Sequence, residues 1–208
     1  MTRGKFIVME GIDGCGKTTQ YNNLFAHLKE EMKYGAVFGT KEPNTFDNNG
    51  LRAIEMLKSD RDPYDKGFEA MKLFALNRKA HNQIFIPLLN RGVDVLSDRY
   101  WHSNFAYQHA QGIPHEEIVL FNSGSLVPDL TILIDLPVDE SVKRRALRDG
   151  NNFSKYERNA DFLHQVRLNY LNLQKILPEN IAIIDGTRSK KEVWDDVLNA
   201  YKSRFQAE

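Results

Sequence analysis

A run of eight residues near the N-terminus limits what this chain can fold into more than any other feature. Residues 11–18 read Gly-Ile-Asp-Gly-Cys-Gly-Lys-Thr and match the pattern G-x-x-x-x-G-K-[ST] at every fixed position. The apolar run KFIVME at 5–10 predicts a buried strand before this loop, and apolar residues at helical spacing over 17–33 predict a helix after it. The sequence therefore predicts a strand, a glycine-rich loop and a helix in that order.

A loop of this kind binds phosphate groups. Its glycines let backbone N–H groups point inward, and the N-terminus of the following helix adds a favourable dipole. We expect Lys17 to reach the β- and γ-phosphates of a nucleotide and Thr18 to ligate Mg²⁺. The alternative, a plain glycine-rich turn, is disfavoured because both flanks match. The expected phosphate-binding set is Gly11, Gly14, Cys15, Gly16, Lys17, Thr18 and Thr19.

Cys15 is the only cysteine of the chain. We favour a small residue that is tolerated there for its backbone, and the alternative is a thiol made acidic by the helix N-terminus. A single cysteine excludes an internal disulfide and fits a reducing compartment, most simply the cytoplasm.

Beyond the loop, short apolar runs alternate with longer helical patterns. Strands between helices pair in parallel, and near-continuous apolar strands indicate a sheet covered on both faces. Without repeats or linkers, residues 1–208 are expected to form a single three-layer α/β domain around a five-stranded parallel sheet. The further strands are expected at 36–40, 93–98, 129–135 and 181–185, and the further helices at 51–58, 65–90, 139–148, 160–177 and 189–205.

Charge and hydropathy exclude some classes of partner. Lysine plus arginine total 28 and aspartate plus glutamate total 28, so the net charge is 0. A dedicated duplex-DNA binder usually needs an excess of positive charge, so we expect no nucleic-acid partner. The longest apolar runs, such as IFIPLL at 84–89, are far shorter than the ~18 residues that span a bilayer, so we expect no membrane partner.

Two residues at the end of the strand expected at 93–98 suit phosphoryl transfer. In an open parallel sheet the ligand crevice lies beyond the carboxyl ends of the strands. Arg99 could hold a phosphate there with a bidentate fork, and Asp98 could organise Mg²⁺. The alternative is a structural ion pair at the end of the strand. A guanine-specific GTPase is disfavoured because the sequence has no N-K-x-D motif.

Four motifs together resemble the thymidylate kinase family over essentially the whole chain: E-G-x-D-G-x-G-K-T-T at 10–19, Lys41-Glu42-Pro43, L-F-x-x-N-R at 73–78 and D-R-Y-x-x-S-x-x-A-Y at 98–107. The resemblance implies a P-loop NTPase fold with a small lid segment and a homodimer. It also implies direct transfer of the γ-phosphoryl group of MgATP to dTMP, giving dTDP and ADP in dTTP biosynthesis.

The resemblance also implies how dTMP would be bound. Phe74 would stack on the thymine ring and Arg78 would hydrogen-bond a base carbonyl, although plain core packing is the alternative for Phe74. Asn104 would read the pyrimidine edge and Tyr107 would pack on the deoxyribose. Asp13 would contact the sugar 3′-hydroxyl. The implied substrate-binding set is Asp13, Lys41, Arg52, Phe74, Arg78, Arg99, Asn104, Tyr107 and Gln108.

At two positions the sequence departs from many members of the family. Lys41 stands where many relatives have arginine, so it keeps the charge and lacks the guanidinium fork, and the Glu42–Pro43 bond is a candidate cis peptide. Gly14 stands where some members have a catalytic arginine, so a late cation must come from elsewhere. The basic segment 143–158 is the expected lid, and its candidate cations are Arg148, Lys155 and Arg158. The expected catalytic set is Lys17, Asp98, Arg99 and Arg148.

Two other functions remain open from the sequence. A deoxynucleoside (thymidine) kinase would phosphorylate a sugar hydroxyl and would have less use for Arg52 and Arg99. A non-catalytic nucleotide-binding module would have no need to keep Asp98 and Arg99 beside an intact phosphate loop.

Overall fold

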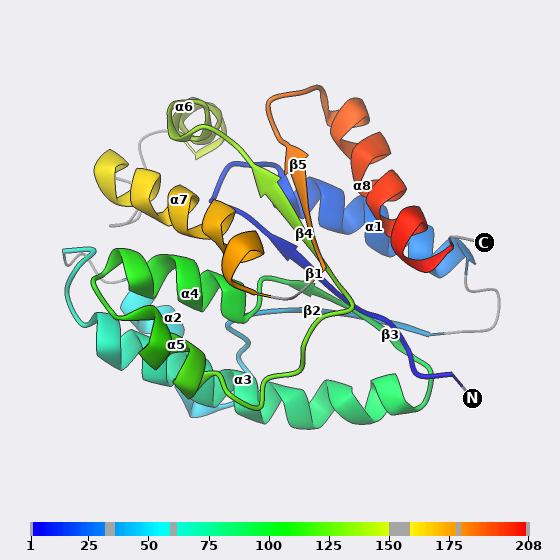
Figure 1. Cartoon of the computed structure of the whole chain (residues 1–208), viewed down its shortest axis with the longest axis horizontal. Coiled ribbons are helices and arrows are strands. Elements are labelled where there is room, and N and C mark those ends of the chain that lie inside the picture. The colour runs from blue at the N-terminus through cyan, green and yellow to red at the C-terminus, as the bar shows by residue number, and fades with distance from the viewer. Residues whose placement is uncertain (1, 32–35, 59–61, 150–158, 178–179, 207–208) are drawn as a thin grey trace.

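The structure is a computed structural model of the 208-residue chain, and it describes all residues except 1, 32–35, 59–61, 150–158, 178–179 and 207–208. The five strands expected from the sequence form one parallel sheet in the order β2-β3-β1-β4-β5 (Figure 1). They are β1 (Phe6–Glu10), β2 (Val37–Lys41), β3 (Asp94–Asp98), β4 (Leu130–Asp135) and β5 (Ile181–Asp185).

Helices cover both faces of this sheet, so the expected three-layer α/β architecture is confirmed. One face carries α1 and α8, and the other carries α3, α4 and α7 (Figure 1). The remaining helices pack on this second layer: α2 on α3, α5 on α3 and α4, and α6 on α7. The helices are α1 (Lys17–Glu31), α2 (Asn48–Lys58), α3 (Gly67–Asn90), α4 (Trp101–Ala110), α5 (His115–Phe121), α6 (Val138–Asp149), α7 (Ala160–Ile176) and α8 (Lys190–Phe205).

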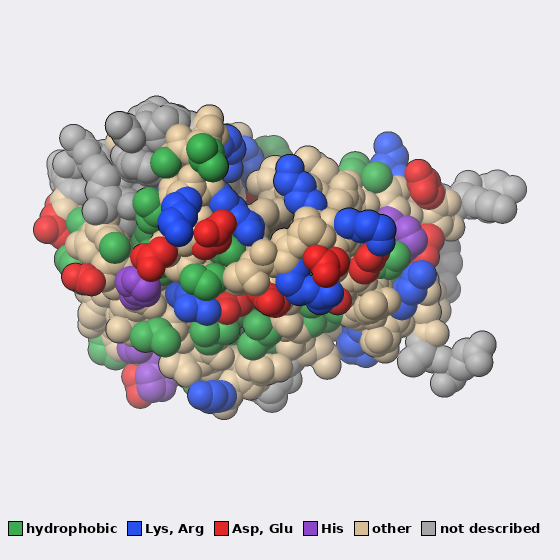
Figure 2. Space-filling view, turned by 90° about the horizontal axis from the view of Figure 1, so that it is seen from above, with side chains coloured by type: hydrophobic (Ala, Val, Ile, Leu, Met, Phe, Trp, Pro, Cys, Tyr) green, Lys and Arg blue, Asp and Glu red, His purple; other side chains and the backbone are tan. Residues whose placement is uncertain are grey.

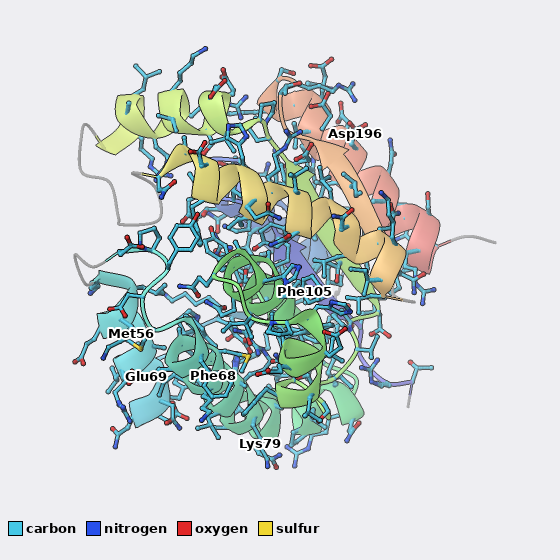
Figure 3. All side chains as sticks on the ribbon, turned by 60° about the vertical axis from the view of Figure 1, so that its left-hand side comes forward. Met56, Phe68, Glu69, Lys79, Phe105 and Asp196 are labelled. Carbon is cyan, nitrogen blue, oxygen red and sulfur yellow. The ribbon has the colours of Figure 1, made fainter. Side chains whose placement is uncertain are left out.

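Two of these helices, α4 and α5, were not predicted from the sequence. Helix α4 is buried on most of its circumference because it lies between α3 and α7. It therefore lacks the polar face that makes a helix recognisable as amphipathic. Phe105 of α4 is 1% exposed and lies deep in this layer (Figure 3). Helix α5 has only seven residues, too few for a periodic pattern.

The register of the sheet sets the position of the site. Strand β1 pairs with β3 on one side and with β4 on the other. Met9 lies opposite Asp98, and Lys41 of β2 lies opposite Asp98 as well. The carboxyl ends of β1, β2 and β3 therefore meet at one edge of the sheet, at a point where the strand order reverses, which is where open α/β sheets bind ligands.

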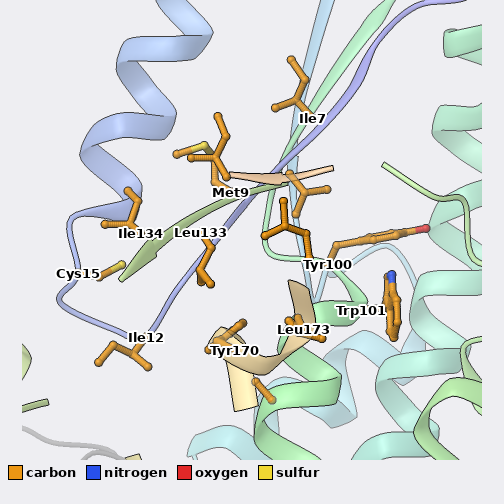
Figure 4. Close-up of a cluster of buried hydrophobic side chains, with 14 of the residues drawn as sticks. Ile7, Met9, Ile12, Cys15, Tyr100, Trp101, Leu133, Ile134, Tyr170 and Leu173 are labelled. Atoms are coloured by element: carbon orange, nitrogen blue, oxygen red, sulfur yellow. The ribbon is translucent and has the colours of Figure 1, made fainter. Parts of the chain in front are cut away.

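A buried apolar cluster supports this edge from below. Figure 4 shows side chains of β1 and β4, among them Ile7, Met9 and Leu133, in the buried cluster that continues to Ile12 and Cys15 of the loop. Each such side chain contributes about 1.5–3 kcal/mol when fully buried, so the loop is anchored to the hydrophobic core. No helix among the described residues is long and apolar enough to cross a membrane.

Candidate active site

The glycine-rich loop joins β1 to α1, as expected, and its backbone needs glycine at Gly14. Gly14 has φ +84°, a conformation that other residues adopt only with strain. A Cβ atom there would lie 2.9 Å from the carbonyl oxygen of Ser141 and 2.9 Å from Cγ of Arg145, both on α6. The Ser141 hydroxyl donates to the carbonyl oxygen of Asp13 at 2.6 Å. Helix α6 therefore packs directly against the loop.

Lys17 and Asp98 face each other across the carboxyl ends of the strands. Lys17 is 6% exposed at the start of α1, and its Nζ lies 3.5 Å from Oδ1 of Asp98. Among the described residues, nothing donates a hydrogen bond to this buried oxygen. An unsatisfied carboxylate oxygen suits a hard cation. Thr18, the next residue on α1, is exposed and lines the same cleft.

Arg99 turns sharply out of β3. Its φ is +71°, an uncommon conformation for a residue with a side chain. The turn is held by two hydrogen bonds, from the Arg99 N–H to the carbonyl oxygen of Met9 at 2.9 Å and from the Ser97 hydroxyl to the Arg99 carbonyl oxygen at 2.7 Å. The guanidinium lies 2.6 Å from Asp13 Oδ1 and donates to Ser103 Oγ at 2.9 Å. This backbone conformation and these contacts place the cation beside the phosphate loop.

A second, buried carboxylate supports Arg99. Glu10 is 0% exposed at the end of β1, and its Oε1 accepts from the N–H of Tyr100 at 2.8 Å. Its Oε2 accepts from the hydroxyls of Ser103 at 2.7 Å and Tyr170 at 2.9 Å, and lies 3.9 Å from Nη1 of Arg99. Burial and the charge of Glu10 raise the pKa of Tyr170 well above its usual value, so its hydroxyl stays protonated and donates. Sequence patterns assign no role to Glu10 or Tyr170.

The charges of the loop shift the pKa values of two of its residues. Burial by itself raises the pKa of Asp13, but the positive charges of Arg99 and Lys17 outweigh it and lower this pKa to about 2. Burial raises the pKa of the Cys15 thiol, and its side chain points toward Ile134 of β4 (Figure 4). Cys15 is therefore a small buried residue with a protonated thiol, and the alternative of a reactive cysteine is disfavoured.

A cleft of about 780 Å³ opens above these residues. Its walls are the phosphate loop, the ends of β2 and β3, helix α6 and the start of α8. Lys41 and Arg148, expected from the sequence, line it, and so does Arg188, which was not expected. The lining cations are Lys17, Lys41, Arg99, Arg144, Arg148, Arg188 and Lys190. Such a cleft can hold a polyanion of nucleotide size.

The lid expected at 143–158 lies only in part within the described residues. Its first part is helix α6, on which Arg148 is exposed. Lys155 and Arg158 lie outside the described residues. Seen from the side of α6 and α8, basic and acidic side chains are interspersed, and the cations are not gathered into one patch (Figure 2).

Helices α3 and α4 carry the residues expected to bind the base. Phe74 is half-buried on α3, and Arg78, one turn later, is 2% exposed. Nε of Arg78 donates to Oε2 of Glu42 at 2.7 Å, and the Glu42–Pro43 bond is cis. Asn104 is buried on α4, and its Nδ2 donates to Oε1 of Gln108 at 2.7 Å.

Two further expected residues lie at different distances from the phosphate loop. Tyr107 of α4 lies beside Arg99, whose guanidinium carbon is 5.6 Å from the centre of its ring. Arg52 of α2 is exposed and pairs with Glu69 at 3.5 Å. It is absent from the described lining of the 780 Å³ cleft. The structure thus brings Tyr107 to the phosphate-binding residues and leaves Arg52 at the surface.

Comparisons with known proteins agree with this geometry. A family model described as thymidylate kinase matches residues 9–197. The chain is 38% identical over 203 residues to a probable thymidylate kinase of Pyrococcus abyssi, covering 96% of this chain and 97% of that protein. It is 35% identical to a thymidylate kinase of Vesicomyosocius okutanii, over 95% and 97% of the two chains. It is 33% identical to a thymidylate kinase of Nitrosomonas eutropha, over 100% and 97%.

Proposed function

The chain belongs to the thymidylate kinase family, and from that premise we propose how its own residues carry out the reaction. The protein is a kinase that phosphorylates dTMP to dTDP in an ATP-dependent transfer. The observation that carries the proposal is the set of charges at the carboxyl ends of β1 and β3, where Lys17, Asp98 and Arg99 face one cleft. Phosphoryl transfer is mostly positioning and charge neutralisation, and this set supplies both.

The donor nucleotide is proposed to lie on the glycine-rich loop. Backbone N–H groups of residues 11–19 cradle its phosphates, and Lys17 neutralises charge on the β- and γ-phosphates. Arg99, held by Asp13 and Glu10, is proposed to grip the acceptor phosphate and align it for in-line attack. Because the fork is already oriented by its partners, little entropy is lost when substrate binds.

A magnesium ion fits the residues present. Asp98 Oδ1 is buried and without a donor among the described residues, and the Thr18 hydroxyl lines the same cleft. We propose that these two groups hold Mg²⁺ together with phosphate oxygens and water. When bound, the ion would neutralise charge on the transferring phosphoryl group.

On the acceptor side, Phe74, Arg78, Asn104 and Tyr107 are proposed to bind the thymine and deoxyribose, with Gln108 behind Asn104. Lys41 is proposed to contact a phosphate from the cleft wall, and Asp13 to meet the sugar 3′-hydroxyl. Arg52 would need to leave Glu69 to reach the monophosphate, and both are surface side chains, so the change is inexpensive.

The basic segment 143–158 is proposed to act as a lid, with Arg148, Lys155 and Arg158 as its cations. Arg148 lines the cleft, which supports a role near the donor phosphates. Closure would exclude water and suppress hydrolysis of ATP. Arg148→Ala should lower kcat more than it raises the KM for ATP, because a lid cation acts late. A change confined to the KM for ATP would contradict the assignment.

We further propose one domain over residues 1–208, a homodimer and a cytoplasmic location. A lone free cysteine fits a reducing compartment. Apolar side chains exposed on α2, α3 and α5 support an interface between two copies: Leu51, Phe68, Leu76, Leu120 and Phe121.

One assay tests the proposed substrate. ATP-dependent turnover would be compared for dTMP, thymidine, dUMP and UMP. We expect the highest kcat/KM for dTMP. Turnover of thymidine without turnover of dTMP would move the protein to the deoxynucleoside kinases, and no turnover of any acceptor would contradict both enzyme functions.

A further inference from the structure

Asn122, at the C-terminal end of α5, joins two residues that the proposed function places against the base. Its side chain is 6% exposed. Its Oδ1 accepts from Nη1 of Arg78, and its Nδ2 donates to Oδ1 of Asn104 at 2.9 Å. We propose that Asn122 is a positioning residue that fixes which way the Asn104 amide faces, and thereby favours pyrimidines that carry a hydrogen on N3. This inference rests on the proposed function, which places Asn104 at the base.

Asn122 belongs to a chain of side chains in which every hydrogen bond runs in one direction. Arg78 donates to Asn122, which donates to Asn104, which in turn donates to Gln108. Gln108 donates to Gln111 at 2.7 Å, and Gln111 donates to the carbonyl oxygen of residue 63, before α3. The chain thus starts at a buried cation and ends at a backbone acceptor.

The two ends of this series of hydrogen bonds, at Arg78 and at Gln111, force its direction. A guanidinium has only donors, so the oxygen of Asn122 must face Arg78. Nε of Arg78 is engaged by Glu42, and His81 lies 3.2 Å from the other oxygen of that carboxylate, so Arg78 is held in place from behind. The carbonyl oxygen at position 63 can only accept, so Gln111 must present its nitrogen. Between these ends each amide has one favourable orientation, and turning one of them would place like groups face to face.

The consequence appears at Asn104. Its oxygen faces Asn122 and keeps one free lone pair, while its nitrogen faces Gln108 and keeps one free hydrogen. A thymine or uracil ring offers the matching pattern, an N3–H donor next to a carbonyl acceptor. Cytosine offers the reverse at N3 and N4, an acceptor next to a donor. The orientation of the Asn104 amide therefore decides whether thymine and uracil or cytosine can form both hydrogen bonds. A base that leaves these buried groups unpaired loses binding free energy.

The test replaces the orienting amide with a carboxylate of nearly the same size. In Asn122→Asp the new carboxylate can still accept from Arg78, but it cannot donate to Asn104 and accepts best from an Asn104 amide turned to present its nitrogen. Because Gln108 still favours the original orientation, the Asn104 amide is no longer held in one orientation from both sides. The matched control is Gln111→Glu, the same exchange of amide for carboxylate three hydrogen bonds further along. At position 111 the side chain already accepts a hydrogen bond from Gln108, and a glutamate oxygen can do the same. The Asn104 amide therefore keeps its orientation in this variant.

The measurement is kcat/KM for dTMP and for dCMP at saturating ATP, with dissociation constants of both monophosphates from calorimetry without ATP. We expect Asn122→Asp to lower the dTMP-to-dCMP ratio by about tenfold or more, the effect of one reversed hydrogen bond at a buried site. Full reversal is not expected, because Arg78 still disfavours the amino group of cytosine. Gln111→Glu should keep the wild-type ratio.

The ratio separates an orienting role from a merely structural one. If Asn122 only stabilised the end of α5, its replacement would lower kcat/KM equally for dTMP and dCMP and leave their ratio unchanged. An unchanged ratio in a folded Asn122→Asp protein overturns the inference, and so does an equal loss in the Gln111→Glu control. If Asn122→Asp does not fold, Asn122→Leu takes its place: without the orienting bond the ratio should also fall, and an unchanged ratio overturns the inference. If the wild type does not phosphorylate dTMP, the proposed function itself has failed.

Discussion

At the scale of single residues, Arg99 combines an unfavourable backbone conformation with several well-formed contacts. Its φ of +71° costs of order 1–2 kcal/mol, which the bonds to Met9, Ser97 and Asp13 offset. Strain that is maintained at the end of a strand, next to a phosphate loop, is consistent with a catalytic side chain that must point in one direction.

We therefore expect Arg99→Ala to reduce kcat by roughly 10²–10³-fold, the loss typical of removing a charge that stabilises the transition state. Circular dichroism should show an unchanged fold. The matched variant is Arg99→Lys, which keeps the charge and loses the fork, and it should recover only part of the activity. Near-normal turnover of Arg99→Ala would refute the role assigned to this residue.

The lowered pKa of Asp13 predicts how the stability of the fold depends on pH. Its pKa in the folded protein is about 2, below the value of about 3.9 for an unfolded chain. Stability that depends on this carboxylate is therefore present above pH 4 and is lost as the pH falls from about 4 to about 2. Its side chain is 47% exposed, so solvent screening limits the effect to about 1 kcal/mol or less.

The measurement is the thermal midpoint of the wild type and of Asp13→Asn between pH 2 and pH 5. The difference between the two proteins should be constant above pH 4 and should shrink toward pH 2. A difference that does not depend on pH would contradict the depressed pKa.

Residues within short motifs could be predicted from the sequence, and their remote partners could not. Lys17 and Asp98 stand at fixed places relative to a loop and a strand end, so pattern alone located them. Glu10 meets Tyr170, which is 160 positions away, and Asn122 meets Arg78, which is 44 positions away. Sequence spacing carries no information about such contacts, because they arise only when helices dock in three dimensions.

At the scale of elements, amphipathic helices and apolar strands were predictable because one face differs from the other. Helix α4 was not, since seven of its ten residues are buried and its periodicity disappears. The close packing of α6 on the phosphate loop could not be predicted from the sequence either. The sequence shows only that Gly14 stands where some members of the family have arginine. The structure shows that a side chain at Gly14 would collide with α6.

This contact can be tested with Gly14→Ala. The added Cβ would lie 2.9 Å from the Ser141 carbonyl oxygen, so α6 must shift, and the strain of φ +84° is added to that. Gly112→Ala is the matched control, because φ is +87° there but no atom lies within 4 Å of the new Cβ. We expect urea denaturation to show a loss of about 1 kcal/mol for the control and about 2–3 kcal/mol for Gly14→Ala. Equal losses would mean that α6 does not press on the loop.

At the scale of the whole molecule, the net charge of zero is informative about nucleic acid and uninformative about small anions. Seven lysine and arginine side chains line one cleft, beside three acidic residues, Asp13, Glu42 and Asp98. The acidic side chains that balance the total lie largely outside this cleft. Local distribution governs binding of a polyanion here, since the summed field of a neutral molecule is weak.

The surface also predicts how the molecule assembles. On α3, Leu76 is 51% exposed and borders a groove of about 630 Å³ that it shares with Leu120 and Phe121. Leu51 on α2, which packs against α3, is 47% exposed as well, and we expect a second copy to cover these apolar side chains. Figure 3 shows Met56 of α2 and Glu69 of α3 where these two helices run side by side.

Leu76→Glu should therefore convert a dimer into a monomer, because a carboxylate buried in an apolar interface without a partner costs several kcal/mol. In the monomer the new side chain can pair with Lys72 or Lys79 on the same helix, so the fold should persist. Leu168→Glu is the matched control, since Leu168 is 53% exposed on α7, away from the groove. Analytical ultracentrifugation should show a dimer for the wild type and the control and a monomer for Leu76→Glu. A monomeric wild type would contradict the proposed dimer. A Leu76→Glu dimer of unchanged affinity would mean that the interface lies elsewhere.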